Sequence, residues 1–326
     1  MTQKLDESAR GVYVIAATPF TDDGALDLDS TDRVVDFYLK HGANGLTVLG
    51  VMGEAPKLAA DESRRFVERV LARVDGRIPV IVGISAAGLA PMQELAAASM
   101  GAGAAGVMVQ PAGPLRGDDA IVGYFEMVAE ALGAGVPIAL QDHPLASGVP
   151  MPVPVILRIL KAVPTCVMLK HEDWPGPGLA KVAAIRAASA RGDARRVSIL
   201  AGNGGGLFLP EELSRGVDGA MTGFAYPEMM VDVCGAHAAG DLDRAHDLFD
   251  AYLPLARYEQ QSALGLAVRK YLLKRRGAIA SDAIRRPGAR LSPADVADIE
   301  RLVERQSRRL RSLGDDGGKG GRGERI

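Results

Sequence analysis

Eight short, almost wholly apolar runs recur along the first 240 residues, and amphipathic stretches of helical period separate them. The runs span residues 11–17, 45–49, 79–84, 106–109, 136–141, 166–170, 197–201 and 219–222. The stretches between them span residues 30–41, 59–73, 90–100, 118–132, 152–162, 178–190 and 210–215. Apolar strands that alternate with helices are typical of a parallel sheet covered by helices. Eight such units in roughly 230 residues predict an α/β fold, a (β/α)8 TIM barrel.

The alternative is an open, doubly wound sheet of the dinucleotide-binding kind. Its best support is the glycine-rich run at residues 202–206 (GNGGG). This run lacks the full dinucleotide-binding spacing and has no acidic residue at the expected distance. We therefore interpret it as a turn that follows a barrel strand.

The pattern changes after about residue 240, where the strand signals stop. Residues 241–255, 260–276 and 293–312 read as three further helices, and Ser292 is a suitable N-cap for the last one. Residues 313–326 are rich in glycine and charge, so we expect a disordered tail. The predicted organisation is a barrel that carries the active site (1–240), a three-helix domain (241–312) and the tail (313–326).

Composition narrows the class of protein. The chain has 326 residues, 48% of them hydrophobic, and a formal net charge of −2. No charge patch indicates nucleic acid, and no apolar run is long enough to span a membrane. The N-terminus does not resemble a signal peptide, and Cys166 and Cys234 lack metal-ligand spacing. We expect a cytoplasmic protein with two thiols.

In a barrel of this kind the chemistry lies where the strands end, at their carboxyl side. The sixth predicted strand ends on Lys170, and a Pro/Gly cluster follows at residues 175–178. Removing an ammonium group from water at the end of a buried strand costs free energy, so a lysine is expected there only when it has a function. A desolvated lysine amine becomes neutral more readily, and a neutral amine can form a Schiff base with a carbonyl. At the mouth of a barrel, we favour Schiff-base formation over the alternative that Lys170 only extends to solvent or pairs with an acidic neighbour.

Several segments together resemble the dihydrodipicolinate synthase/N-acetylneuraminate lyase family of class I aldolases, over about residues 10–310. They are Thr18-Pro19-Phe20 with Asp23-Gly24, the Gly50-x-x-Gly53-Glu54 loop, the lysine that ends strand six, and the C-terminal helices. The resemblance implies a barrel with a helical C-terminal domain and a Schiff base between Lys170 and a 2-oxo acid. It also implies a homo-oligomer, usually a tetramer, and neither a metal nor an organic cofactor.

The chain departs from this family at the positions that handle substrate. Val51 and Met52 stand where two hydroxylated residues usually hold the substrate carboxylate, so only backbone groups of the 50–53 turn remain for that task. Gln141 replaces the tyrosine that relays protons to the Schiff base, and glutamine cannot titrate. The family's tyrosine pair after strand four falls on Ala112 and Gly113, and the arginine after strand five falls on Ala146.

Another residue must therefore move protons. If Lys170 points into the barrel, alternation along the strand directs Glu172 the same way and His171 away from it. Glu172 is our first candidate for acid–base work and His143 the second, since a histidine gives and takes protons near neutral pH. Asp142 and His171 are expected to be structural or solvated.

Other strand-end residues are assigned to substrate. We assign substrate binding to the turn residues Gly50, Val51, Met52 and Gly53, and to Gln141, Asn203 and Thr222. Trp174, the only tryptophan, is either a pocket wall or a surface-packing residue.

The predicted function is a Schiff-base-forming lyase that acts on a 2-oxo acid, such as a 2-keto-3-deoxy sugar acid. The sequence is compatible with both an aldolase and a dehydratase. The alternatives are a condensation of the dihydrodipicolinate synthase type, or a catalytically idle member that binds a small acid. The missing tyrosines motivate the idle alternative, and the lysine at the strand-six mouth argues against it.

Overall fold

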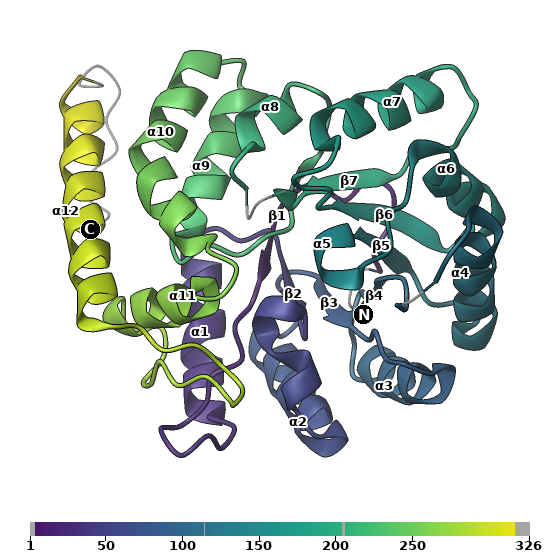
Figure 1. The fold of residues 1–326 in the computed structure, drawn as a ribbon, viewed down its shortest axis with the longest axis horizontal. Coiled ribbons are helices and arrows are strands. Elements are labelled where there is room, and N and C mark those ends of the chain that lie inside the picture. Colours follow the sequence, from purple (N-terminus) through teal and green to yellow (C-terminus); the bar gives the residue numbers. More distant parts are fainter. Residues whose placement is uncertain (1–3, 114, 204–205, 317–326) are drawn as a thin grey trace.

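The computed structural model describes residues 4–113, 115–203 and 206–316, and its eight strands close into one parallel barrel (Figure 1). The strands are β1 (Gly11–Ile15), β2 (Gly45–Val48), β3 (Val80–Gly83), β4 (Gly106–Val109), β5 (Ile138–Asp142), β6 (Cys166–His171), β7 (Ser198–Ala201) and β8 (Gly219–Ala220). They follow one another in sequence order around the barrel, and β8 pairs with β1. The predicted TIM barrel is confirmed, and the open-sheet alternative is wrong.

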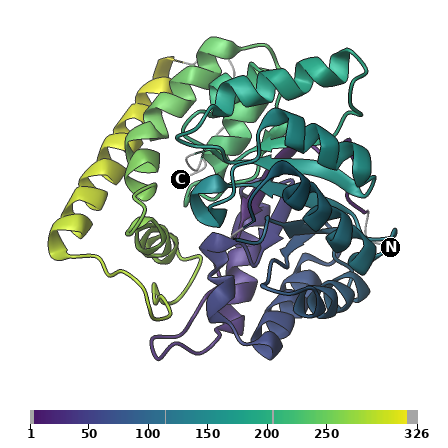
Figure 2. The same cartoon turned by 45° about the vertical axis from the view of Figure 1, so that its right-hand side comes forward.

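The predicted helices of the barrel are present and lie outside the strands (Figures 1 and 2). They are α1 (Leu28–Lys40), α2 (Ala60–Val74), α3 (Leu89–Gly101), α4 (Asp118–Leu132), α6 (Val153–Ala162), α7 (Gly178–Ala190) and α8 (Leu209–Leu213). The sequence did not predict the 3-10 turns η1 (Val51–Gly53) and η2 (Ala55–Lys57), or the helices α5 (Pro144–Ser147) and α9 (Pro227–Ala238). Three of these are too short to show a period, and α9 buries few large apolar side chains.

Side chains of the strands alternate between an inner and an outer core. The inner core fills the barrel and includes Tyr13, Ile15, Ile81, Met108, Ala139, Met168, Leu200 and Met221. The intervening residues, such as Val14, Leu140 and Leu169, belong to the outer core between strands and helices. The two-residue period of a strand therefore decides which strand-end residues face the barrel axis.

Strand β6 contains one more residue than its neighbour β5 over the paired region. Ile138 pairs with Cys166 and Ala139 pairs with Met168, which leaves Val167 as a β-bulge. Cys166 belongs to the outer core, whereas Val167 and Met168 both belong to the inner core. The bulge thus directs Lys170, two residues after Met168, toward the inside of the barrel.

Three helices follow the barrel: α10 (Leu242–Glu259), α11 (Gly265–Arg275) and α12 (Pro293–Asp316). Helix α10 packs against both α9 and α12, and α12 lies outermost (Figure 1). The Ser292 cap is confirmed, since the Asp295 amide donates to Ser292 Oγ at 3.2 Å. The predicted tail begins too early, because residues 313–316 continue α12, and residues 317–326 lie outside the described residues. Every helix in the described part of the chain is too short or too polar to cross a membrane.

A buried ion pair joins the barrel to these C-terminal helices. Glu54, directly after the 50–53 turn, accepts from Lys270 Nζ of α11 at 2.5 Å and from Lys57 Nζ at 3.0 Å. The Arg285 amide donates to the same carboxylate at 3.1 Å. Glu54 and Lys270 are both buried, and burial lowers the pKa of Lys270 while Glu54 opposes that shift. Glu54 is therefore an anchor for the turn beside the barrel mouth.

Replacing Glu54 with glutamine should destabilise the fold, because it leaves the Lys270 ammonium buried without its counter-charge. We expect the free energy of unfolding to fall by about 3–5 kcal/mol, measured by urea denaturation. The control is Glu94→Gln, which breaks the exposed Arg64–Glu94 pair and should change stability by less than about 1 kcal/mol. Equal effects of the two substitutions would contradict the anchoring role.

Candidate active site

Four predicted residues converge at the carboxyl ends of β5 and β6, around one oxygen of Glu172. Lys170 Nζ lies 2.9 Å from Glu172 Oε2, and Gln141 Nε2 donates to the same oxygen at 2.7 Å. His143 Nδ1 lies 3.7 Å from it. Lys170 is only 4% exposed, so the amine and its carboxylate partner sit in a water-poor site.

The strand register produces this convergence. Gln141 pairs directly with Lys170, and each lies two residues beyond an inner-core residue of its strand. Glu172 fits beside β7 because the next residue there is Gly202; a Cβ atom at Gly202 would lie 2.5 Å from Glu172 Cγ. The predicted common orientation of Lys170 and Glu172 is therefore present, and a glycine supplies the space for it.

The 50–53 turn follows β2 at the same end of the barrel and contributes backbone groups. Its residues form η1, with Val51 exposed and Met52 packed against the inner core. The N–H groups of Gly53 and Glu54 donate to the carbonyls of Gly50 and Val51. Thr18 Oγ1 donates to the Gly53 carbonyl at 2.6 Å and holds the turn against β1. Only the N–H groups at the start of the turn are left for an anionic substrate group.

Asn203 and Thr222 take the opposite orientation to the Lys170 group. They alternate with Gly202 and Met221, so they lie on the outer side of their strands. Asn203 Nδ2 donates to Glu212 Oε1 of α8 at 2.7 Å, and Thr222 Cγ2 lies next to Gly206. The contacts of the described residues do not bring either side chain to Lys170, and substrate binding by both stays a prediction.

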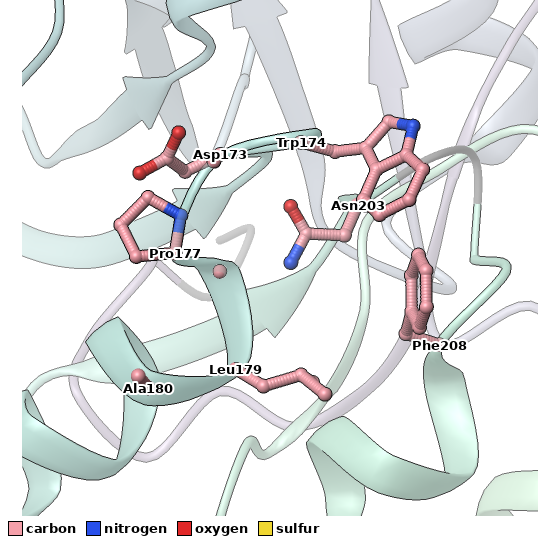
Figure 3. A pocket seen from close by; sticks show the side chains of 9 residues that line it. Asp173, Trp174, Pro177, Leu179, Ala180, Asn203 and Phe208 are labelled. Carbon is pink, nitrogen blue, oxygen red and sulfur yellow. The ribbon is translucent and has the colours of Figure 1, made fainter.

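A side pocket of about 270 Å³ opens between the loop after β6 and the loop after β7 (Figure 3). Trp174 and Phe208 form one wall, with ring centroids 4.7 Å apart, and the Asn203 amide lies between this wall and Pro177. Trp174 is thus a pocket wall. The lining does not include Lys170, so this pocket is separate from the Lys170 group.

Several buried charged residues were not anticipated from the sequence, and two of them, Glu212 and Lys181, lie close to the strand ends. Glu212 lies on α8 three residues after the buried Leu209, and Lys181 lies on the buried face of α7 with Ile185. A charged residue at an apolar position of a helical period is the signal that could have identified both. Lys181 contacts Asp142, which is fully buried, as is His171; neither is solvated.

Burial raises the pKa of Glu212 to about 8, and the hydrogen bond from Asn203 only partly opposes this. The folded chain therefore keeps a proton on Glu212 that the unfolded chain loses above about pH 4.5. This contribution to stability is fully present below pH 4.5 and disappears as the pH rises to about 8.

Glu212→Gln, which mimics the protonated side chain, should remove that dependence. Between pH 4.5 and 8 the free energy of unfolding of the wild type should fall relative to that of the variant, by about 1 kcal/mol per pH unit. Urea denaturation of both proteins at several pH values measures the difference. Parallel stability curves for the two proteins would contradict the assignment.

The arrangement at Lys170 can support imine chemistry. A carboxylate in contact with a lysine can remove the proton that blocks the amine, and can later carry protons to and from a bound substrate. Gln141 does not titrate and fixes the orientation of that carboxylate. Within the described ranges, no group of three or more His, Cys, Asp or Glu side chains is placed to hold a metal ion.

Comparisons with known proteins identify a family, relatives and a solved structure of the same fold. Residues 8–306 match the model of the dihydrodipicolinate synthetase family. The chain is 32% identical to L-2-keto-3-deoxyarabonate dehydratase of Azospirillum brasilense over 317 residues, which cover 94% of this chain and 97% of the relative. It is 30% identical to 4-hydroxy-tetrahydrodipicolinate synthase of Kineococcus radiotolerans over 289 residues, or 88% and 89% of the two chains. The crystal structure of dihydrodipicolinate synthase from Rhodopseudomonas palustris superimposes with a TM-score of 0.90 at 49% identity, covering 93% of this chain and all of the other.

Proposed function

The chain belongs to the dihydrodipicolinate synthetase family and is an enzyme of the lyase class, and from this premise we propose that Lys170 forms a Schiff base with a 2-oxo acid. The contact of 2.9 Å between Lys170 Nζ and Glu172 Oε2 carries the proposal. It supplies a buried nucleophile and, at the same position, a group that can take and return its proton.

The first step activates the amine. The Lys170 ammonium passes a proton to Glu172, and the free amine attacks the C2 carbonyl of the substrate. Glu172 returns this proton to the C2 oxygen and then transfers a second proton to it from the attacking nitrogen, so the oxygen leaves as water and a protonated imine remains between Lys170 and C2. The substrate carboxylate lies at the start of the 50–53 turn, where backbone N–H groups are available.

The second step uses the imine as an electron sink. Glu172 removes a proton from C3, which gives an enamine, and then protonates the C4 hydroxyl as it leaves as water. Water hydrolyses the resulting unsaturated imine, which releases the product and restores Lys170. In an aldol cleavage, Glu172 removes the C4 hydroxyl proton instead, and the C3–C4 bond breaks to give an aldehyde and the enamine. His143, 3.7 Å from Glu172, is positioned to exchange protons with it.

The substrate class that we propose is the 2-keto-3-deoxy sugar acids, with dehydration as the preferred reaction. The Azospirillum relative, which matches over nearly the whole chain, is named as a dehydratase of such an acid. In dehydration, a single carboxylate can remove the C3 proton and then protonate the departing C4 hydroxyl, so no tyrosine relay is needed.

The second candidate is a condensation of the dihydrodipicolinate synthase type. Its support is the 49% identity to the Rhodopseudomonas palustris chain that bears that name. Against it stand Gln141 and Ala146, where the family resemblance implies a tyrosine and an arginine.

The decisive experiment combines trapping with a substrate screen. Incubation with pyruvate and borohydride, followed by mass mapping, should place a reduced adduct on Lys170. A panel of 2-keto-3-deoxy acids is then assayed for dehydration and, separately, for pyruvate release. The proposal would fail if no 2-oxo acid gave an adduct, or if the adduct lay on another lysine.

We also propose a homo-oligomer, a tetramer or a dimer, that works in the cytoplasm. The family resemblance supports the assembly, and light scattering of the purified chain tests it. Cys166 and Cys234 are both free thiols, which supports a reducing compartment.

A further inference from the structure

Four ionisable side chains form a buried cluster on the outer face of β5 and β6, directly behind the Lys170 group. We call Asp142, His171, Asp173 and Lys181 the reverse-face cluster; none is more than 7% exposed. Lys181 Nζ of α7 lies 2.8 Å from Asp142 Oδ2 and 2.5 Å from Asp173 Oδ2. His171 Nδ1 lies 3.3 Å from Asp142 Oδ2, and its Nε2 lies 2.9 Å from the Gly178 carbonyl oxygen.

We infer that the reverse-face cluster positions Glu172 for proton transfer, with Asp173 and Lys181 as positioning residues. The inference rests on the proposed function, because it explains how Glu172 is held in the position that proton transfer requires.

The chain order connects the cluster to the site. His171 lies between Lys170 and Glu172, Asp173 follows Glu172, and Asp142 separates Gln141 from His143. The site residues face the barrel while their neighbours face α7, so a shift of one set moves the other.

Main-chain bonds make this connection stiff. The Glu172 amide donates to the Asp142 carbonyl at 2.8 Å, and the Gly202 amide donates to the His171 carbonyl at 2.8 Å. Since Lys181 bridges Asp142 and Asp173, it holds the backbone of β5 and the residue after Glu172 to a single point on α7. Glu172 lies between these two attachments.

Stability alone does not account for such a cluster. Buried ion pairs can often be replaced by apolar residues of similar volume without loss of stability. A catalytic carboxylate, in contrast, must be held within a fraction of an ångström, and supporting hydrogen bonds and ion pairs achieve this. A displacement of about 1 Å lowers a rate by about 10²-fold.

The test is Asp173→Asn, which keeps the shape of the side chain and leaves the Lys181–Asp142 pair in place. Trapping of pyruvate on Lys170 should be unchanged, because the nucleophile is intact. Exchange of the pyruvate methyl protons with deuterium, which requires a base at C3, should slow by up to about 10²-fold. Turnover of the sugar-acid substrate should fall with it through kcat, with little change in KM.

A fluorescence measurement and a control variant separate a loss of positioning from a general loss of structure. Trp174 is the only tryptophan, and its amide donates to the Glu172 carbonyl at 2.9 Å, so its emission reports movement of this segment. The matched control is Asp119→Asn, which breaks the exposed Arg158–Asp119 pair and should change none of these quantities. If Asp173→Asn fails to fold, the same measurements are made on His171→Gln, with the same expected results. This variant retains a donor for the Gly178 carbonyl.

The outcomes distinguish the inference from the proposed function. Wild-type protein that forms the adduct, together with an Asp173→Asn variant that exchanges deuterium and turns over at wild-type rates, would overturn the inference alone. Wild-type protein that forms no adduct would overturn the proposed function and the inference with it. Loss of both trapping and exchange in a folded variant would also overturn the inference, because the defect would then lie at Lys170.

Discussion

Lys170→Ala should abolish borohydride-trapped adduct and turnover together. The alanine side chain has no amine to attack C2, and no second amine is held against Glu172 among the described contacts of that carboxylate. We expect kcat/KM to fall by at least about 10⁴-fold, the scale seen when a covalent nucleophile is removed. Mass mapping after pyruvate and borohydride, with a steady-state assay on the same preparation, measures both effects.

The control for Lys170 is Lys161→Ala, on the exposed end of α6. This variant should retain adduct and activity, which excludes a general effect of removing a lysine. Turnover that survives in Lys170→Ala would show that the reaction proceeds without an imine on this residue. An adduct on Lys181 of α7 would show that the wrong amine had been assigned.

Glu172→Gln should leave the imine accessible but stop the steps that follow it. The amide keeps the size of the side chain and can still contact Gln141 and Lys170, yet it cannot accept a proton from C3. We expect turnover to fall by about 10²- to 10⁴-fold, the usual contribution of a general acid–base group. Adduct should still form, more slowly, because the Lys170 ammonium has lost the carboxylate that takes its proton.

Deuterium exchange at the pyruvate methyl group is the measurement that isolates this step. It should be lost in Glu172→Gln and retained in the control Glu68→Gln, on the exposed face of α2. Retained exchange in Glu172→Gln would assign the C3 base to another residue, with His143 as the first to examine.

Much of the fold follows from the sequence because strands and helices have different periods. The eight apolar runs located the strands to within two residues at each end. Helix α9 was missed because its buried side chains are few and closely spaced, and α12 was ended too early because its final turn is polar. Packing against neighbouring elements fixes both helices, and a single-sequence pattern does not contain that information.

The site was predictable to the extent that it depends on strand ends. The rule that chemistry lies at the carboxyl ends of barrel strands brought together Lys170, Glu172, Gln141 and His143. The same rule does not say which way a strand end faces, and Asn203 and Thr222 therefore turned out to lie on the outer side. Partners from helices, such as Lys181 and Lys270, are 39 and 216 residues from the carboxylates they contact. No local pattern encodes such pairings.

The orientation of Lys170 depends on where the regular alternation of β6 is interrupted, as well as on which residues the strand contains. If Val167 took a regular place in the ladder and alternation ran unbroken from Cys166, the strand would present Leu169 and His171 to the barrel, and the amine would face α7. Each position of β6 after the bulge would exchange its environment with its neighbour: the amine would meet the carboxylates that now hold Lys181, and an imidazole would enter the barrel. Loss of the bulge would therefore convert the active face of the strand into its supporting face without altering any reactive side chain, whereas deletion of Val167 itself would leave Met168 and Lys170 facing the barrel. A main-chain irregularity at a residue without a reactive group thus decides which side chain of the strand performs the chemistry.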